Sequence, residues 1–381
     1  MAATRRILHI WIVFSVKGDA SMKWMKIPIV LFIGIVLLFI FADREKLPTD
    51  HSSLAEQTQP PASSSPHLLP QVTSENPKDT AEMGPPLPYV SQLTGLGSEV
   101  ELRQRPLVVM IENHVKARPQ SGLDKADLIY EVLAEGEITR FISVFHSQSA
   151  EIIGPVRSIR PYFVQLGNAL DGVLVHAGWS QDAMDMMVSK KAAHLDELYG
   201  DGGNYWRSAD RKPPHNLYTS TDKMNQGIAN RKFRLEWKPN AYSFVTEKRD
   251  IIEGTSATRI DIPYILGYHV AYEYDPNAQV YLRAMNNEPH LDRETGKQLS
   301  AANVLVIASK HKIVDDVGRR QVDVIGPGKG MIFQQGKMRE ISWELKNGLI
   351  RAYIDGQEVS MIPGVTWVQI VPLGTVTKIE D

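Results

Sequence analysis

Two arginines lie at an unexpected place in the segment GPVRSIRPYF, residues 154–163. Arg157 and Arg160 are three residues apart between two prolines, in a stretch otherwise apolar enough to belong to a core. Guanidinium groups are planar and bind carboxylate or phosphate oxygens through paired hydrogen bonds. The segment therefore predicts part of an anion-binding cleft. The alternative is that each arginine forms a structural ion pair with an acid. The acids considered for such pairs are Asp127, Glu131 and Glu135.

Further polar residues follow expected strand ends in the same part of the chain. In a layered fold, strand ends and the loops after them line one rim, so these side chains are expected to converge there. Burying this many cations requires anionic partners, which favours a ligand over ion pairs alone. The predicted ligand-binding residues are His114, Arg118, Arg140, Arg157, Arg160, His176, Arg207, Arg211, His215 and Asn216.

Arg157 and Arg160 are expected to have different roles. A proline disfavours helical geometry at the residue before it, so Pro161 predicts an extended Arg160. Side chains three residues apart on a strand point to opposite faces. We therefore expect one of the two arginines to face the ligand and the other to brace the fold through an acid.

Catalysis is an alternative function for the same region. The catalytic candidates are His176, His215 and Asp210, with a histidine as the general base of a hydrolase or transferase acting on cell-wall material. His176 ends an apolar strand and also fits a core histidine, whereas His215 follows two prolines in an expected exposed loop. Ser180 lies where a strand turns into a helix, but the second glycine of a nucleophile elbow is missing, so helix capping is its expected role.

No metal or cofactor is predicted. His114, His176 and His215 lack the spacings of zinc-binding motifs. GPGKG at 326–330 has neither the spacing nor the hydroxyl residue of a phosphate-binding loop, and it fits a β-turn. The chain contains no cysteine, which excludes thiolate metal sites, disulfides and a cysteine nucleophile. Its formal net charge of -2 gives no indication of nucleic-acid binding.

The N-terminal region predicts a membrane anchor. Ile27–Ala42 is an uncharged apolar run, about 24 Å long as a helix. Residues 1–26 carry five Lys and Arg residues and one acid, so the positive-inside rule places them in the cytoplasm. We expect a single-pass protein of the cell membrane whose folded domains are extracytoplasmic. A cleaved signal peptide, or translation starting at Met22 or Met25, are the alternatives.

Composition after the anchor indicates a linker and two folded domains. Residues 43–88 contain nine prolines and no Phe, Trp or Tyr, which favours a disordered tether. Residues 89–248 alternate strand-like and helix-like runs and predict a mixed α/β domain that carries the Arg/His cleft. Residues 249–381 contain short β-rich runs between turn residues and predict a mostly antiparallel β domain. The predicted fold class is α+β, with an N-terminal transmembrane helix.

Several runs of the folded region resemble one bacterial family. They are RPLVVMIENHVKARPQSGLDKADLIYE, EGEITRF, IGPVRSIRPYF, HAGWS and WRSADRKPPHNLYTS in the first domain, and YLRAMNNEPHLDRETGKQLSAANV and PGVTWVQIVP in the second. These runs are similar to the YerB-like envelope proteins. The resemblance implies two domains of unknown function, usually carried by a lipoprotein on the outer face of the membrane, and it implies no reaction. This chain has no cysteine for lipid attachment, so the transmembrane helix is expected to replace the lipid.

The predicted location narrows the expected partners. The cell wall and its biosynthetic machinery lie nearest to a tether on the outer face of the membrane. An anionic glycopolymer or an envelope enzyme is therefore the expected partner, and the lead hypothesis is ligand binding through the Arg/His cleft. The alternatives are the hydrolase or transferase described above and a scaffold that docks other envelope proteins.

Overall fold

The computed structural model describes residues 87–238, 241–245, 253–265 and 267–381. The basic segment 1–26, the predicted anchor Ile27–Ala42 and nearly all of the predicted linker lie outside the described residues. Within the described part of the chain, no helix is long and apolar enough to span a bilayer. The described residues belong to one compact unit, Thr80–Asp381.

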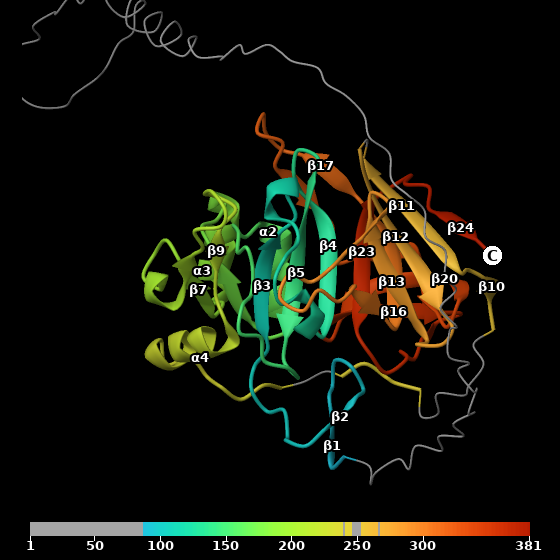
Figure 1. The fold of residues 1–381 in the computed structure, drawn as a ribbon, viewed down its shortest axis with the longest axis horizontal. Helices are drawn as coiled ribbons and strands as arrows, with labels where there is room; N and C mark the ends of the chain where they lie inside the picture. Colours follow the sequence, from blue (N-terminus) through green and yellow to red (C-terminus); the bar gives the residue numbers. More distant parts are fainter. Residues whose placement is uncertain (1–86, 239–240, 246–252, 266) are drawn as a thin grey trace, which may run out of the picture. The chain divides into compact units, whose positions relative to one another are not determined.

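A 12-stranded sheet forms the centre of this unit (Figure 1). Its order is β22-β21-β20-β19-β16-β23-β4-β5-β3-β6-β7, and β10 pairs with β20. The strands are β3 (Leu107–Glu112), β4 (Leu128–Glu135), β5 (Ile138–Phe145), β6 (Val173–His176), β7 (His194–Asp196), β10 (Thr255–Ser256), β16 (Asn303–Ser309), β19 (Gly328–Gln334), β20 (Lys337–Lys346), β21 (Leu349–Ile354), β22 (Gln357–Glu358) and β23 (Thr366–Pro372).

A second, six-stranded sheet packs beside the first, and its strand pairs are all antiparallel. Its order is β14-β13-β12-β11-β24, with β15 paired to β13. The strands are β11 (Arg259–Ile265), β12 (Tyr268–Asp275), β13 (Val280–Met285), β14 (Glu288–Pro289), β15 (Ser300–Ala301) and β24 (Lys378–Glu380).

Short hairpins and helices complete the described fold. Three two-stranded pairs are present: β1 (Tyr89–Val90) with β2 (Gly97–Ser98), β8 (Trp206–Arg207) with β9 (Leu217–Tyr218), and β17 (His311–Ile313) with β18 (Arg320–Val322). The α-helices are α2 (Pro161–Ala169), α3 (Gln181–Lys190) and α4 (Thr221–Asn230), and the 3-10 helices are η1 (Val115–Ala117), η2 (Leu123–Lys125) and η3 (Gly202–Asn204). The described residues are thus mostly β-strand with few helices, which agrees with the coarse α+β prediction.

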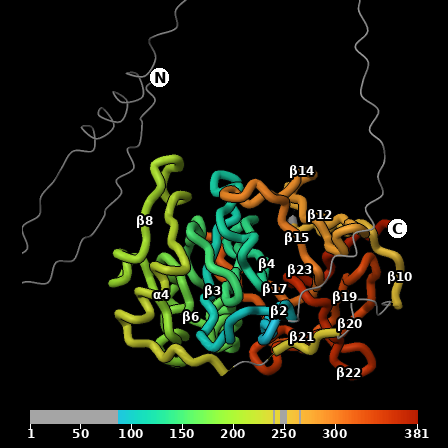
Figure 2. The backbone as a smooth tube through the Cα atoms, turned by 60° about the horizontal axis from the view of Figure 1, so that its bottom comes forward, coloured from blue at the N-terminus to red at the C-terminus, as the bar shows by residue number. Residues whose placement is uncertain are grey.

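Strands from both predicted domains join the main sheet. β23 pairs in parallel with β4, from Thr366 opposite Leu128 to Ile370 opposite Val132, and also in parallel with β16. Figure 2 shows β4 beside β23 in this arrangement. The boundary predicted after residue 248 falls outside the described residues, so the domain limits stay a prediction.

Two hydrophobic cores form because residues along a strand alternate between faces. On β3, Val109 packs in the core that also contains Tyr272 of the second sheet. Its neighbour Val108 packs in the other core, with Phe163 of α2 and Met187 of α3. The central strands therefore carry the second sheet on one face and two helices on the other.

The segment 154–160 follows β5 in the chain, lies beside the end of β3 and leads into α2. Val156 bridges to Ile111, and Ile159 bridges to Trp179. Arg160 is extended, as the proline after it predicts, and α2 begins at Pro161, where a missing backbone N–H costs no hydrogen bond. This path places the start of α2 next to the start of α3.

Candidate functional site

A cavity of about 510 Å³ lies between the first turns of α2 and α3 and the β17–β18 hairpin. The charged residues that line it are Arg160, Asp182, Asp315, Arg319 and Arg320, and the hydroxyl residues are Tyr162 and Ser180. Arg160 belongs to the predicted ligand-binding set, and Ser180 was expected only to cap a helix. The other five are not among the predicted ligand-binding or catalytic residues.

Each arginine of the cavity has partners for some of its guanidinium nitrogen atoms but not for all of them. Arg160 pairs with the carboxylate of Glu135 and donates from Nη1 to the carbonyl of Ile159. Arg319 lies 2.6 Å from Asp315, and Arg320 donates from Nη2 to the carbonyl of Gly136 at 2.7 Å. The Nε groups of Arg160 and Arg320 are buried and have no hydrogen-bond partner among the described residues. Two residues that line the cavity therefore have a donor without a partner among the described residues.

Burial and a neighbouring cation act on Arg160. The residue is 7% exposed, and burial lowers the pKa of its guanidinium, with the charge of Arg319 lowering it further. A guanidinium nevertheless keeps its charge at neutral pH. An anion in the cavity would relieve the repulsion between the two arginines.

The first turns of α2 and α3 both open onto this cavity. Arg160 and Ser180 occupy the N-cap positions, and neither side chain forms a capping hydrogen bond. The Ser180 hydroxyl is buried, with 8% of the residue exposed, and has no partner among the described residues. Helix N-termini present free N–H groups and a partial positive charge, which favour anions. The expected cap position of Ser180 is confirmed, but the capping hydrogen bond is absent.

A second group of charges surrounds Glu112 at the end of β3. Arg157 Nε lies 3.3 Å from Glu112 Oε1, and His215 Nδ1 lies 3.0 Å from Glu112 Oε2. The ring of His114 stacks on that of His215, with centroids 4.5 Å apart. Burial lowers the pKa of His114, and the neighbouring His215 lowers it further.

Arg140 lies between the two groups of charges. Its Cα pairs with that of Glu112 across β3 and β5, and its Nη1 lies 3.6 Å from the Glu135 carboxylate that holds Arg160. Burial lowers the pKa of Arg140 to about 10, and the charge of Arg157 contributes in the same direction. The predicted residues Arg140, Arg157 and Arg160 thus lie together with two acids, Glu112 beside Arg157 and Glu135 between Arg140 and Arg160. Both arginines of GPVRSIRPYF pair with an acid, and of the two only Arg160 also lines the cavity.

His176 is separate from both groups. It is fully buried, with Nε2 3.2 Å from His194 Nδ1 and Nδ1 3.1 Å from the carbonyl of Gly178. Burial lowers its pKa to about 3, and His194 contributes in the same direction. A neutral imidazole without exposed surface fits the core-histidine alternative better than a general base.

The remaining predicted residues hold loops together. Arg207 donates to Asn216 Oδ1 at 3.2 Å and to Glu197 at 3.1 Å. Arg211 donates to the carbonyls of Ala117 and Pro119. These contacts give the three predicted residues Arg207, Asn216 and Arg211 a structural explanation.

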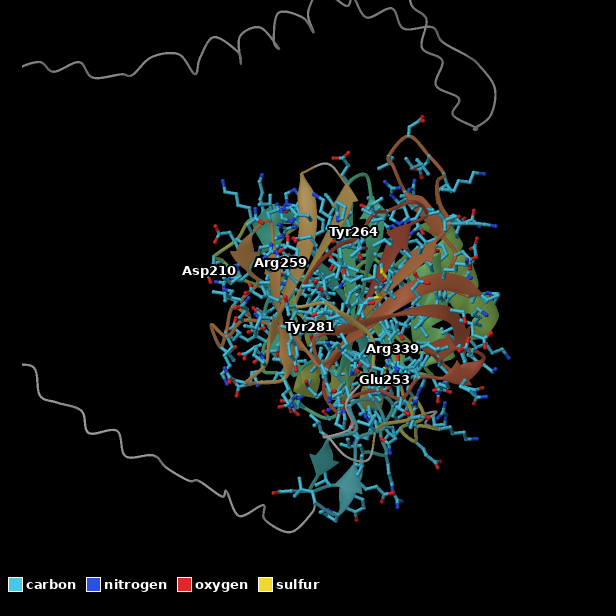
Figure 3. All side chains as sticks on the ribbon, turned by 90° about the vertical axis from the view of Figure 1, so that its right-hand side faces the viewer. Asp210, Glu253, Arg259, Tyr264, Tyr281 and Arg339 are labelled. Carbon is cyan, nitrogen blue, oxygen red and sulfur yellow. The ribbon has the colours of Figure 1, made fainter. Side chains whose placement is uncertain are left out.

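Arg118 and Asp210 also lie away from the cavity. Arg118 Nε donates to Asn113 Oδ1 at 3.0 Å, and its guanidinium lies 4.9 Å from the ring centroid of Tyr268. Asp210 pairs with Arg293 at 2.9 Å on the surface, at the outer edge of the molecule in Figure 3. Asp210 therefore does not orient either catalytic candidate histidine.

A buried polar network between the two sheets was not predicted. Arg283 Nη2 lies 2.6 Å from Glu131 Oε2, and neither side chain has exposed area. Tyr268 donates to Glu131 Oε1 at 2.6 Å, and Asn113 donates to Tyr268 at 2.8 Å. The guanidinium of Arg283 also lies 4.5 Å from the ring centroid of Trp367. Because both charges are paired and enclosed, the network holds β4 against β12 and β13.

Metal ligation finds no support in the described part of the chain, where no group of three or more His, Cys, Asp or Glu residues is placed to hold an ion.

Both halves of the fold match protein families of unknown function. Residues 93–234 match the family described as "Protein of unknown function (DUF3048) N-terminal domain", and residues 260–368 match its C-terminal domain. The chain belongs to this YerB-like family, which confirms the resemblance drawn from the sequence. All residues that line the cavity lie within these two matches.

One curated relative and one solved structure show the same relationship. The chain is 41% identical over 282 residues to the "Putative lipoprotein YerB" of Bacillus subtilis (strain 168), covering 74% of this chain and 85% of the relative. The crystal structure of the YerB protein from Bacillus subtilis has a TM-score of 0.71 and 39% identity, covering 76% of this chain and 99% of that one.

Proposed function

We propose that this chain is a membrane-anchored, extracytoplasmic protein of the cell envelope that binds an anionic ligand in the cavity between α2, α3 and the β17–β18 hairpin. The name of the Bacillus subtilis relative supports an envelope location. The uncharged run Ile27–Ala42, with basic residues before it, supports a transmembrane anchor for this chain, which has no cysteine.

The observation that carries the binding proposal is the joint placement of cations and uncapped helices. Three arginines and the first turns of two helices open onto one cavity, together with the buried, unpartnered hydroxyl of Ser180. Buried polar groups are normally hydrogen-bonded, so a free hydroxyl and free Nε groups require an explanation. An anion that accepts hydrogen bonds from them provides one.

Structural ion pairing is the alternative explanation for these arginines. Glu135 and Asp315 each hold one of them. These pairs account for one side of each guanidinium. They leave the Nε groups of Arg160 and Arg320 and the hydroxyl of Ser180 without partners among the described residues. We therefore interpret the acids as groups that position the arginines.

Calorimetric titration of the full chain in detergent micelles with D-glucuronate tests the proposal. Arg319→Ala removes a cavity cation and is expected to weaken binding about tenfold to a hundredfold, the usual value of a charge-assisted hydrogen bond. Arg293→Ala is the matched control, because Arg293 also forms an ion pair but does not line the cavity. Equal losses in both variants, or no binding of D-glucuronate, glycerophosphoglycerol or tripolyphosphate to the unchanged protein, would refute the proposal.

A hydrolase or transferase with His215 as general base is a second candidate function. The hydrogen bond that His215 Nδ1 donates to the Glu112 carboxylate favours it, because a carboxylate in that position fixes the ring and leaves Nε2 free to accept a proton. Release of soluble fragments from purified cell wall is the measurement. The candidate requires turnover by the unchanged protein that His215→Gln abolishes and His269→Gln, on β12, retains.

Docking of another envelope protein stays a prediction. Ile313, Val314 and Val317 are exposed at and beyond the end of β17. Exposed apolar side chains of this kind are found at protein interfaces, although single ones are also common on ordinary surfaces.

A further inference from the structure

We infer that the cavity selects a singly charged anion that also carries hydroxyl or ammonium groups, and that it does not select a dense polyanion. This inference rests on the proposed anion binding and specifies the class of ligand.

The balance of charge in the cavity is the first argument. Three guanidinium groups, from Arg160, Arg319 and Arg320, and two carboxylates, from Asp182 and Asp315, line the cavity. Beside them, Glu135 pairs with both Arg160 and Arg140, and the charges of Glu135 and Arg140 cancel. One net positive charge remains, to which the two helix N-termini add partial charge. A ligand with one negative charge is neutralised by this arrangement. A ligand with several negative charges would place unpaired charge beside two carboxylates.

Asp182 supplies the second argument. It is exposed on the first turn of α3, and its carboxylate makes no hydrogen bond or ion pair with any described residue. Asp315 differs, because it accepts the backbone N–H groups of Val317 and Arg319 at 3.1 Å each and pairs with the Arg319 guanidinium. Asp182 is therefore the carboxylate available to accept hydrogen bonds from a ligand. Its contribution at a helix N-terminus explains its position but leaves its oxygens unused.

Cavity size is the third argument. A volume of about 510 Å³ lies within the range of about 300 to 1,000 Å³ for small-molecule sites. An inorganic anion would leave most of this space to water. Gln165, Gln181 and Gln321 also line the cavity, and their amides both donate and accept hydrogen bonds. A sugar-sized unit with one acidic group fits both the volume and these amides.

Two sources share this ligand chemistry: a uronate of a glycan and a phosphodiester of a polyol. The experiment is a titration of the full chain in detergent micelles with four probes: D-glucuronate, glycerophosphoglycerol, D-glucose and tripolyphosphate. Either of the first two is expected to bind at least tenfold more tightly than glucose, which lacks the charge, and than tripolyphosphate, which lacks the hydroxyls. The tighter of the two identifies the source.

Asp182→Asn tests the carboxylate directly. Removing this negative charge is expected to weaken the binding of the singly charged probe severalfold and to strengthen the binding of tripolyphosphate severalfold. Asp222→Asn is the matched control, because Asp222 is exposed at the same position of α4, after Ser220, and does not line the cavity. The control is expected to change neither affinity.

The outcomes distinguish failure of the inferred ligand class from failure of the proposed anion binding. If tripolyphosphate binds most tightly and Arg319→Ala abolishes its binding, the cavity binds anions but the inferred class is wrong. If Asp182→Asn strengthens all anions alike, the carboxylate does not recognise the ligand and the inference is again wrong. If no probe binds, both fail.

Discussion

Glu131 and Arg283 form an ion pair of 2.6 Å in which neither side chain has exposed area. Glu131 belongs to β4 of the main sheet and Arg283 to β13 of the second sheet. The pair therefore connects the two sheets through a direct contact between buried side chains. Tyr268, Thr139 and Asn113 satisfy the remaining acceptors around it.

Removing one partner of this pair is expected to destabilise the fold strongly. Arg283→Met leaves the Glu131 carboxylate buried without its cation, at an expected cost of about 3–5 kcal/mol in the free energy of unfolding. Arg234→Ala breaks the exposed pair with Asp171 and is expected to cost about 0–1 kcal/mol. Denaturant unfolding of both variants measures the difference. Equal costs would show that the buried pair contributes no more than a surface pair.

Two serines at helix N-caps are expected to respond differently to alanine. The Ser220 hydroxyl accepts the N–H of Lys223 at 3.2 Å, so Ser220→Ala should lower the free energy of unfolding by about 1 kcal/mol. Ser180 makes no capping hydrogen bond, so Ser180→Ala should leave stability nearly unchanged while weakening anion binding. Thermal unfolding and titration with D-glucuronate check the two expectations. Loss of stability in Ser180→Ala without loss of binding would assign this serine a structural role.

The sequence predicted the local structure around the cavity, but it did not predict which residues line the cavity. Burial of β3, the extended Arg160 and the N-cap position of Ser180 follow from apolar runs and from Pro161, which act over a few residues. Arg319 and Arg320 come from a hairpin that is distant along the chain. Their position depends on the bridge from Arg319 to Glu135. No periodicity in the sequence reports such long-range pairing.

The same limit applies to predicted ligand-binding residues that also make contacts within the fold. Arg207 is the last residue of β8 and Arg211 lies in the loop after it, yet they bond to a nearby amide and to backbone carbonyls. An arginine in a loop carries the same local signal whether it meets a ligand or a carbonyl. His176 shows the converse, because its apolar flanks correctly indicated a core position.

Acid is expected to destabilise the fold through buried histidines. Burial, followed by the charge of Arg320, lowers the pKa of His311 to about 4, against about 6.5 in an unfolded chain. Between pH 6.5 and 4 the unfolded chain binds a proton that the folded chain excludes, so stability falls as the pH falls. His311→Gln should reduce this loss by about 1–2 kcal/mol at pH 5. Unfolding curves from pH 8 to 4.5 measure it, and identical slopes in both proteins would contradict the assignment.

Membrane attachment is expected to depend on Ile27–Ala42. A charge in the centre of a transmembrane helix is costly, so Leu37→Arg should shift the protein from the membrane to the soluble fraction. Leu69→Arg, in the predicted linker, is the control and should stay with the membrane. Fractionation of cells that express each variant is the measurement. Membrane retention of Leu37→Arg after carbonate extraction would contradict a transmembrane anchor.

Hydrogen exchange of the full chain with and without D-glucuronate locates the ligand most directly. The account predicts slower exchange in peptides that cover residues 178–184, at the start of α3, and residues 314–322, in the hairpin, because the anion accepts from these groups and joins the two elements. Residues 205–216, which carry Arg207, Arg211 and His215, should be unchanged. Protection confined to residues 205–216, with none at α3 or the hairpin, would contradict the cavity as the binding site.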